Sequence, residues 1–585
     1  MMINMYKNFL VLLLSVIVFA GCKKNLSPLD DNHRTLEGIY NDPYYAEGIL
    51  MNAYARLPTN GYSFSEVATD DAVSNDKFNP LLNMATGSWS AASNPMDQWN
   101  NSYTAIVYLN LFLREVDSVN WSYLNKDVRI LFKDRLKGET YGLRGLFMLN
   151  LLQAHAGSAG SGEVLGVPII TSALDVKSDF SKPRNTFVQC VQQIYSDLAE
   201  AEKYLPLDYM DVSLAQIPAK YTGMAAADYN RVFGNFNRQR VSSRIVKAIR
   251  ARVALLAASP AFNPQGVTDK WLDAANFSGN VLTLIGGVSG LDPKGTLYYT
   301  AGNVNALNLA ANIDQKEMLW RGSIATSNDI EIANFPPTLF GNGRVNPTQN
   351  LVDAFPMANG YPITDNASGY VSTNPYIGRD PRLRNYILVN GGTVSNKTIF
   401  TKSDAPTNDA VNMLPTSTRT GYYLRKLLRE DVNANPTSSS VQKRYAVHIR
   451  YTEMFLIYAE AANEAWGPEG MGTYAFSARN VIAAIRKRAG ITQPDLYLTS
   501  ITSKEDMRKL IRNERRLELS FEGFRFWDLR RWKEVLTEQA TGVTINNNVF
   551  LVQPVENRQY ADYMYNGPIP LSEVLKFNFQ QNKGW

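Results

Sequence analysis

The sequence predicts a mainly α-helical protein, in which a helical scaffold is followed by a loop-rich carboxy-terminal region of helices mixed with short strands. Two runs, 135–157 and 186–206, first indicate this, because their apolar side chains recur at helical spacing. In the second run the steps alternate between four and three, through Phe187, Val191, Ile194, Leu198, Ala201 and Leu205. The composition agrees: 45% of the 585 residues are hydrophobic and 19% are charged, as in a globular chain with a sizeable core.

The ends of these two helices are marked by residues that start or stop a helix. Thr186 and Gln189 have the spacing of a capping box, and Pro206 ends the second helix. The first helix carries an apolar stripe of Leu143, Phe147 and Leu151. This helix ends at the glycine-serine stretch 155–162, which cannot continue a helix. The residues GVPII that follow are predicted to form a short extended segment.

The amino terminus has the features of a secretory signal. Lys7 precedes an apolar run, Phe9 to Ala20, that is shorter than the roughly 20 residues of a membrane-spanning helix. The sequence VFAGC resembles a bacterial lipobox, with Phe19 where leucine is usual. We therefore predict a signal peptide over 1–21, lipidation of Cys22 and a polar tether over 22–34, with simple secretion as the alternative.

The segment 37–58 predicts a first helix, with Ile49, Ala53 and Leu57 on one face and Pro58 at its end. From residue 60 to residue 94 the composition changes to glycine, serine, asparagine, aspartate and threonine with scattered aromatic residues. We predict a long irregular loop there. Loops of this length in compact domains are usually functional or disordered, and the aromatic residues argue against disorder.

Further helices are predicted along the chain. One covers 98–117, and a second is indicated by the stripe Ile245, Ile249, Val253 and Leu256 and ends at Pro260. A third has Tyr451, Phe455, Tyr458, Ala462 and Ala465 on one face. A fourth ends at Gly490, and a last long helix follows it. That last helix opens with a predicted capping box of Thr502 and Glu505. The region 265–335 gives no confident assignment.

Charged residues of alternating sign follow in the last long helix and beyond it. They are Glu514, Arg515, Glu518, Glu522, Arg525, Asp528 and Arg530. We interpret them as a structural salt-bridge lattice and not as acid-base machinery. Arg379, which precedes Asp-Pro, is likewise interpreted as an ion-pairing turn that holds loops.

Several separate motifs, taken together, resemble the SusD/RagB family of surface nutrient-binding lipoproteins. They are the helix with its glycine exit and GVPII; Trp99, Tyr103 and Asn110; PTQNLVDAFPMANGYPI, with Phe355 where tyrosine is more usual; RDPRL; GYYLRKL; RFWDLRRW; and the closing PIPLSEVLKFNFQQNKGW. The resemblance runs from the lipobox to Trp585, with the motifs in the family's order.

The resemblance implies a SusD-like fold, with a divergent tetratricopeptide-like scaffold over 35–335 and a carboxy-terminal SusD/RagB region over 336–585 packed on it. It also implies a non-enzymatic binder, lipid-anchored in the outer membrane and facing outward. That binder captures a nutrient glycan and delivers it to a SusC-like, TonB-dependent transporter. No strict repeat period is visible, so the repeat assignment follows from the resemblance alone.

The sequence argues against several other functions. A net charge of +5 from 59 basic and 54 acidic residues forms no basic stripe, so nucleic acid is not an expected partner. The two cysteines, Cys22 and Cys190, make no metal-type pair, and Cys190 is predicted to be buried. The chain has three isolated histidines and no dinucleotide loop or nucleophile elbow, so we predict no catalytic residue, metal or cofactor. A calcium requirement cannot be read from it.

The candidate ligand-binding residues lie in the loop 61–94. Sugar rings stack their CH faces on flat aromatic side chains, and amides and carboxylates bind the hydroxyl groups. Trp89 is the first choice as a platform, followed by Phe78 and Tyr62, with Asp70, Asp71 and Asn75 as polar partners and Trp320 as a further candidate. For each aromatic residue, simple packing within the loop is an equally open alternative.

Three other functions stay open at this point. The first is capture of peptides, as some proteins of the resembling family perform. The second is a helical-repeat adaptor that organises surface partners. The third is a surface glycosidase, since a pair of catalytic carboxylates cannot be located from sequence spacing.

Overall fold

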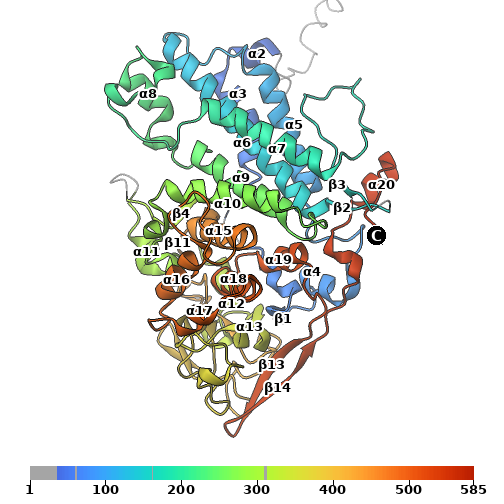
Figure 1. Cartoon of the computed structure of the whole chain (residues 1–585), viewed down its shortest axis with the longest axis vertical. Coiled ribbons are helices and arrows are strands. Elements are labelled where there is room, and N and C mark those ends of the chain that lie inside the picture. The colour runs from blue at the N-terminus through green and yellow to red at the C-terminus, as the bar shows by residue number, and fades with distance from the viewer. Residues whose placement is uncertain (1–35, 60–61, 161, 309–312) are drawn as a thin grey trace, which may run out of the picture.

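The computed structural model describes residues 36–59, 62–160, 162–308 and 313–585 (Figure 1). It is 45% helix and 10% strand, which confirms the predicted mainly helical class. The predicted signal peptide and Cys22 lie outside the described residues. None of the helices in the described part is long and apolar enough to cross a membrane.

The amino-terminal helices form the upper part of the molecule in Figure 1. They are α2 (Leu36–Tyr40), α3 (Pro43–Tyr54), α5 (Trp99–Glu115), α6 (Lys126–His155), α7 (Phe187–Tyr204), α8 (Ala226–Phe233), α9 (Ser243–Ala258) and α10 (Thr268–Thr283). The predicted capping box at the start of α7 is confirmed: Thr186 accepts from the Gln189 backbone N–H, and the Gln189 side chain accepts from the Thr186 N–H.

Two glycines of α6 allow α7 to approach closely. A Cβ atom at Gly138 would lie 2.6 Å from Leu205 Cγ, and one at Gly145 would lie 2.9 Å from Leu198 Cδ2. Real Cβ atoms do not come this near, so larger residues would push the two helices apart. Cys190 of α7 is a buried free thiol, as predicted.

The stretch 60–94 contains regular structure, so the prediction of an irregular loop was wrong in its described part. It holds a 3₁₀ turn η1 (Ser65–Ala68), strand β1 (Ala72–Ser74), the short helix α4 (Pro80–Asn83) and a wide turn η2 (Met84–Ser88). Asn79 caps α4 by accepting from the backbone N–H groups of Leu81 and Leu82. β1 pairs with β6 (Val345–Pro347), whose distance in sequence hides it from local pattern analysis.

The region left unassigned by sequence, 265–335, contains both helices and short strands. After α10 come α11 (Ala301–Asn305), β4 (Met318–Arg321), β5 (Ala325–Ser327) and α12 (Asp329–Asn334). β4 pairs with β12 (Val447–Arg450), so that Trp320 lies opposite Ile449.

The remaining elements are short except for α15, α16 and α18. The helices are α13 (Gln349–Ala354), α14 (Pro381–Tyr386), α15 (Tyr451–Trp466), α16 (Ala478–Ala489), α17 (Leu496–Ser500), α18 (Lys504–Glu518), α19 (Arg525–Trp532) and α20 (Leu571–Phe577). The strands are β2 (Gly157–Ser158), β3 (Val164–Leu165), β7 (Ile387–Leu388), β8 (Gly392–Val394), β9 (Lys397–Ile399), β10 (Tyr423–Leu424), β11 (Gln442–Arg444), β12 (Val447–Arg450), β13 (Ala540–Asn546) and β14 (Val549–Glu556). Every sheet in the described residues is an antiparallel pair.

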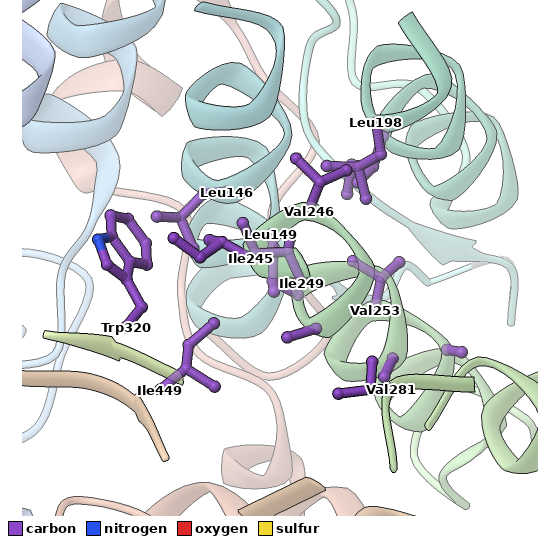
Figure 2. Close-up of a cluster of buried hydrophobic side chains, with 14 of the residues drawn as sticks. Leu146, Leu149, Leu198, Ile245, Val246, Ile249, Val253, Val281, Trp320 and Ile449 are labelled. Carbon is purple, nitrogen blue, oxygen red and sulfur yellow. The ribbon is translucent and has the colours of Figure 1, made fainter. Parts of the chain in front are cut away.

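The main core lies where α6, α7, α9 and α10 meet β4, β12 and α15. Figure 2 shows part of it, with Leu146, Leu149, Leu198, Ile245, Val246, Ile249, Val253, Val281, Trp320 and Ile449. The core therefore takes side chains from both predicted ranges, 35–335 and 336–585.

Two local predictions in the carboxy-terminal half were wrong in detail. The cap of α18 is Ser503, whose hydroxyl accepts from the Asp506 N–H at 3.0 Å, and not Thr502 with Glu505. Arg379 donates to the backbone carbonyl groups of Val352, near the end of α13, and of Phe355 and Pro375. Its neighbour Asp380 makes the ion pair instead, with Arg382.

The predicted salt-bridge lattice is confirmed for most of its members. Glu514 pairs with Arg382 and Arg486, Glu518 with Arg382, Arg450 and Arg488, Glu522 with Arg450 and Lys426, Arg515 with Asp528, and Arg525 with Asp70. Arg530 is the exception. It has no carboxylate partner among the described residues and lies against the rings of Trp89, Phe526 and Tyr560. Burial lowers its pKa to about 10.

Candidate ligand-binding cleft

A cleft of about 560 Å³ opens between the amino-terminal scaffold and the carboxy-terminal helices. Its walls come from α6, α9, β12, α15 and the segment from Glu522 to Arg531, which includes most of α19. This volume lies within the range of small-molecule sites in proteins. The cleft is thus a candidate binding site, and its lining residues come from both parts of the chain.

One wall of the cleft is aromatic. Phe524 and Trp527 are half-buried and line the space. Phe526, between them in sequence, is buried in the core and meets the ring of Trp527 edge-on, with centroids 4.9 Å apart and planes at 90°. Phe526 therefore fixes the orientation of Trp527, and the Trp527 ring is a pre-oriented surface on which a flat or CH-rich ligand can stack.

Two groups of α6 that line the cleft are uncharged and polar. Asn150 and Gln153 are three residues apart, so both side chains lie on the same face of the helix. Both are half-buried, and neither side-chain amide makes a hydrogen bond within the described residues. Each amide offers both a donor and an acceptor, which suits the hydroxyl groups of a ligand.

An ion pair crosses the cleft between α9 and α15. Arg252 Nε lies 2.7 Å from Glu453 Oε1, and Arg252 Nη2 lies 2.5 Å from Glu453 Oε2. Nη2 also donates to the backbone carbonyl of His448 at 2.7 Å. The pair joins the scaffold to the carboxy-terminal part and balances the charge at this wall.

His448 of β12 lines the same wall and is held neutral. Its ring packs on that of Trp320, with centroids 4.6 Å apart. Burial, reinforced by the positive charge of Arg252, lowers its pKa from 6.5 to about 4. The imidazole therefore presents one donor and one acceptor at neutral pH.

The depressed pKa of His448 predicts a pH dependence of stability. Between about pH 6.5 and pH 4 the unfolded chain binds this proton and the folded chain does not, so stability falls as the pH falls through this window. When the pH is lowered from about 7 to about 4.5, we expect the free energy of unfolding to fall by about 2 kcal/mol less in His448→Gln than in the wild type. Urea unfolding of both proteins at the two pH values measures this difference. If the two midpoints fell by the same amount, the lowered pKa of His448 would not be the cause of the pH dependence.

Of the residues predicted from sequence, Tyr62 lines the cleft. Its hydroxyl lies 3.3 Å from that of Tyr298, and burial raises the pKa of Tyr62 to about 12. Tyr62 thus belongs to the same cleft lining as Phe524 and Trp527. The other candidates do not line this cleft.

The predicted polar partners are occupied by structural contacts. Arg525 Nε and Nη2 lie 2.9 and 2.7 Å from the two carboxylate oxygens of Asp70, and Arg516 Nε lies 2.7 Å from Asp71 Oδ1. Both aspartates are buried behind the cleft wall. Asn75 donates to the carbonyls of Asn342 and Ser417 and fixes β1 and its surroundings.

The two predicted tryptophans are core residues, and the predicted phenylalanine is on the surface. Trp89 is 5% exposed and Trp320 is 3% exposed. The Trp320 indole N–H donates to the Gln239 carbonyl at 2.9 Å, and its ring backs His448. Phe78 is 88% exposed, outside the cleft. Burial leaves neither tryptophan face open for stacking.

Sequence reasoning missed Phe524, Trp527, Asn150 and Gln153. The stretch Phe524–Arg525–Phe526–Trp527 does carry a signal, because adjacent helical positions differ by about 100°. Phe526 and Trp527 therefore point in different directions, so a narrow core contact can cover one ring and leave the other partly open. Asn150 and Gln153 carry no such signal, since polar residues on a helix are ordinarily solvated.

Among the described residues, no group of three or more histidine, cysteine, aspartate or glutamate side chains is arranged to hold a metal ion. The acidic residues around the cleft are instead paired with arginines, as in Arg252 with Glu453 and Arg515 with Asp528. The chemistry that the cleft offers is therefore stacking and hydrogen bonding.

Two family models match the chain. Residues 314–585 match the model described as SusD family, and residues 45–231 match one described as starch-binding, associating with the outer membrane. Among curated proteins of Formosa agariphila, SusD-like protein P38 is 36% identical over 103 residues, 17% of this chain and 19% of that protein. SusD-like protein P25 is 28% identical over 158 residues, 26% of each. These matches span about a fifth and a quarter of the relatives' lengths.

Solved structures share the fold over nearly the whole chain. A SusD-like protein of Bacteroides fragilis aligns with a TM-score of 0.72 at 23% identity, covering 96% of this chain and 100% of that one. A SusD-like carbohydrate-binding protein of the same species aligns at 0.67 and 19%, covering 92% and 98%. A surface glycan-binding protein A of Bacteroides fluxus aligns at 0.58 and 17%, covering 93% and 100%.

Proposed function

We propose that this chain, which belongs to the SusD/RagB family, binds a glycan in the cleft between α6, α9, α15 and α19 and delivers it to a SusC-like, TonB-dependent transporter. Members of this family are non-catalytic binding proteins. Anchoring of Cys22 in the outer membrane, with the cleft facing outward, belongs to the same proposal. The family model over residues 45–231, described as starch-binding and associating with the outer membrane, supports it.

The observation that carries the proposal is that Trp527 and Phe524 line the same cleft as the side-chain amides of Asn150 and Gln153, which make no hydrogen bond within the described residues. A sugar ring has an apolar CH face and a rim of hydroxyl groups. The half-buried aromatic wall fits the face, and the free amides fit the rim. The carbohydrate-binding and glycan-binding descriptions of the B. fragilis and B. fluxus proteins of like fold agree with this choice of ligand.

Trp527→Ala tests the proposal. An aromatic stacking contact is worth about 1 kcal/mol or more beyond simple burial, so we expect the affinity for a bound polysaccharide to fall about tenfold or further. Because the ring is half-exposed, the fold should be retained. Residues 23–585 are titrated calorimetrically with a panel of polysaccharides and peptides, after a screen by affinity electrophoresis.

Phe78→Ala is the matched control, since it also removes an aromatic ring but from the surface outside the cleft. Unchanged affinity of Trp527→Ala together with weakened binding of Phe78→Ala would move the site to the surface of 61–94. If the protein bound peptides and no polysaccharide, the ligand of the cleft would be a peptide and not a glycan. Retention of the transporter without binding of either would indicate an adaptor.

A further inference from the structure

We infer that the cleft selects uncharged glycans over glycans that carry carboxylate or sulfate groups. The inference rests on the proposed function and names its ligand class. It follows from the way in which the charged side chains of the cleft are already paired, and from the neutral groups that remain available.

The most accessible cation of the cleft is fully engaged by a carboxylate. Arg252 presents two nitrogens to both oxygens of Glu453, at 2.7 and 2.5 Å. An anionic sugar that approached this guanidinium would meet the Glu453 carboxylate at nearly the same distance. The attraction and the repulsion largely cancel, and the anion would still lose its hydration.

The deeper guanidinium groups are matched in the same way. Arg450 donates to both carboxylate oxygens of Glu522, at 2.7 and 2.9 Å. Arg531 donates to both oxygens of Glu460, at 2.6 and 2.7 Å.

Arg515 completes the set of cleft cations. Its Nε lies 2.8 Å from Asp528 Oδ2. Its Nη1 has no partner among the described residues, but that atom is shielded from solvent. None of these arginines therefore offers an exposed, uncompensated charge to a ligand.

The groups that remain for a ligand are neutral. The side-chain amides of Asn150 and Gln153 and the indole N–H of Trp527 make no hydrogen bond within the described residues. The His448 imidazole is uncharged at neutral pH because its pKa lies near 4. Neutral donors and acceptors beside an aromatic wall satisfy hydroxyl groups, whereas a buried anion without a free cation is costly.

The test compares neutral polysaccharides with their carboxymethylated counterparts, which share a backbone and differ in charge. We expect wild-type residues 23–585 to bind a neutral member at least about tenfold more tightly than its carboxymethylated form. We also expect the affinity for the neutral member to change little between low and physiological salt. A preference for the carboxymethylated form, or binding that weakens steeply with salt, would overturn the inference and leave glycan binding intact.

Glu453→Gln sharpens the test, because it frees the Arg252 charge in the cleft. This variant should gain affinity for the carboxymethylated polysaccharide, and that gain should fade with salt. Glu202→Gln, which breaks the pairs with Lys247 and Arg250 outside the cleft, makes the same change in net charge and should gain nothing. Equal gains in the two variants would contradict the inference. Absence of binding to every polysaccharide would overturn both this inference and the proposed function.

Discussion

Replacing Arg382 by methionine is expected to destabilise the fold by about 3–5 kcal/mol, the cost of removing one partner from a buried ionic cluster. Arg382 is 0% exposed. Its guanidinium contacts three carboxylates: Asp380 at 2.7 Å, Glu514 at 3.0 Å and Glu518 at 3.2 Å. Methionine fills most of the volume but leaves these carboxylates short of positive charge in a dry site. The midpoint of urea unfolding measures the loss.

The pH dependence of this loss has a definite sign. Burial favours protonation of Glu518, but Arg488, Arg450 and Arg382 outweigh it and hold its pKa near 2. Without Arg382 the carboxylates take up protons more readily in the folded protein. The deficit of the variant should therefore shrink as the pH falls from about 7 toward 4.5. Arg384→Met, on the exposed side of α14, is the control and should change stability by less than about 0.5 kcal/mol.

Trp89→Ala is expected to destabilise the protein by about 3–5 kcal/mol while leaving the cleft intact. The Trp89 ring lies edge-on to Phe526, Tyr560 and Trp585, at centroid distances of 5.9, 6.0 and 4.7 Å. It also covers the buried guanidinium of Arg530, 5.0 Å from its centroid. Removal of the ring leaves a cavity. It also removes one of the aromatic rings that pack against the Arg530 guanidinium, which has no carboxylate partner within the described residues.

The conservative variant Trp89→Phe separates ring packing from hydrogen bonding. Phenylalanine keeps a ring in the cluster but loses the indole N–H that donates to Asn94 Oδ1 at 3.0 Å. It should cost clearly less stability than alanine. Ligand affinity, measured on the folded protein, should be unchanged in both variants. If affinity fell as much as in Trp527→Ala, Trp89 would be part of the binding surface.

The scaffold could be predicted from sequence because its information is local. The stripe from Phe187 to Leu205, the Thr186–Gln189 box and Pro206 all lie within one helix and its caps. The region around β1 could not be predicted in this way. β1 is a strand because Val73 pairs with Asn346, and Asp70 and Asp71 are buried because Arg525 and Arg516 reach them from the far end of the chain.

The candidate site shows the same division. The chemistry expected of it, aromatic rings with polar neighbours, is present in the cleft, and Tyr62 was among the residues named for it. The choice of Trp89 over Trp527 depended on local composition. Trp89, in a polar segment, looks accessible, but long-range packing buries it; the same packing leaves Trp527 of α19 half-buried. Sequence alone does not show which side of α19 the core covers.

Because its walls come from distant parts of the chain, the cleft also has an order of assembly. The chain is synthesised from its amino terminus, so α6 and α9 are made before α15 and α19. A nascent or truncated chain without α19 therefore has Asn150 and Gln153 but lacks Trp527. A ligand that needs both walls binds only the finished molecule. At about a hundredfold excess over its dissociation constant it adds roughly 2.7 kcal/mol to that state alone. A bound glycan would therefore protect complete, folded copies of the protein against unfolding and would leave truncated copies unprotected.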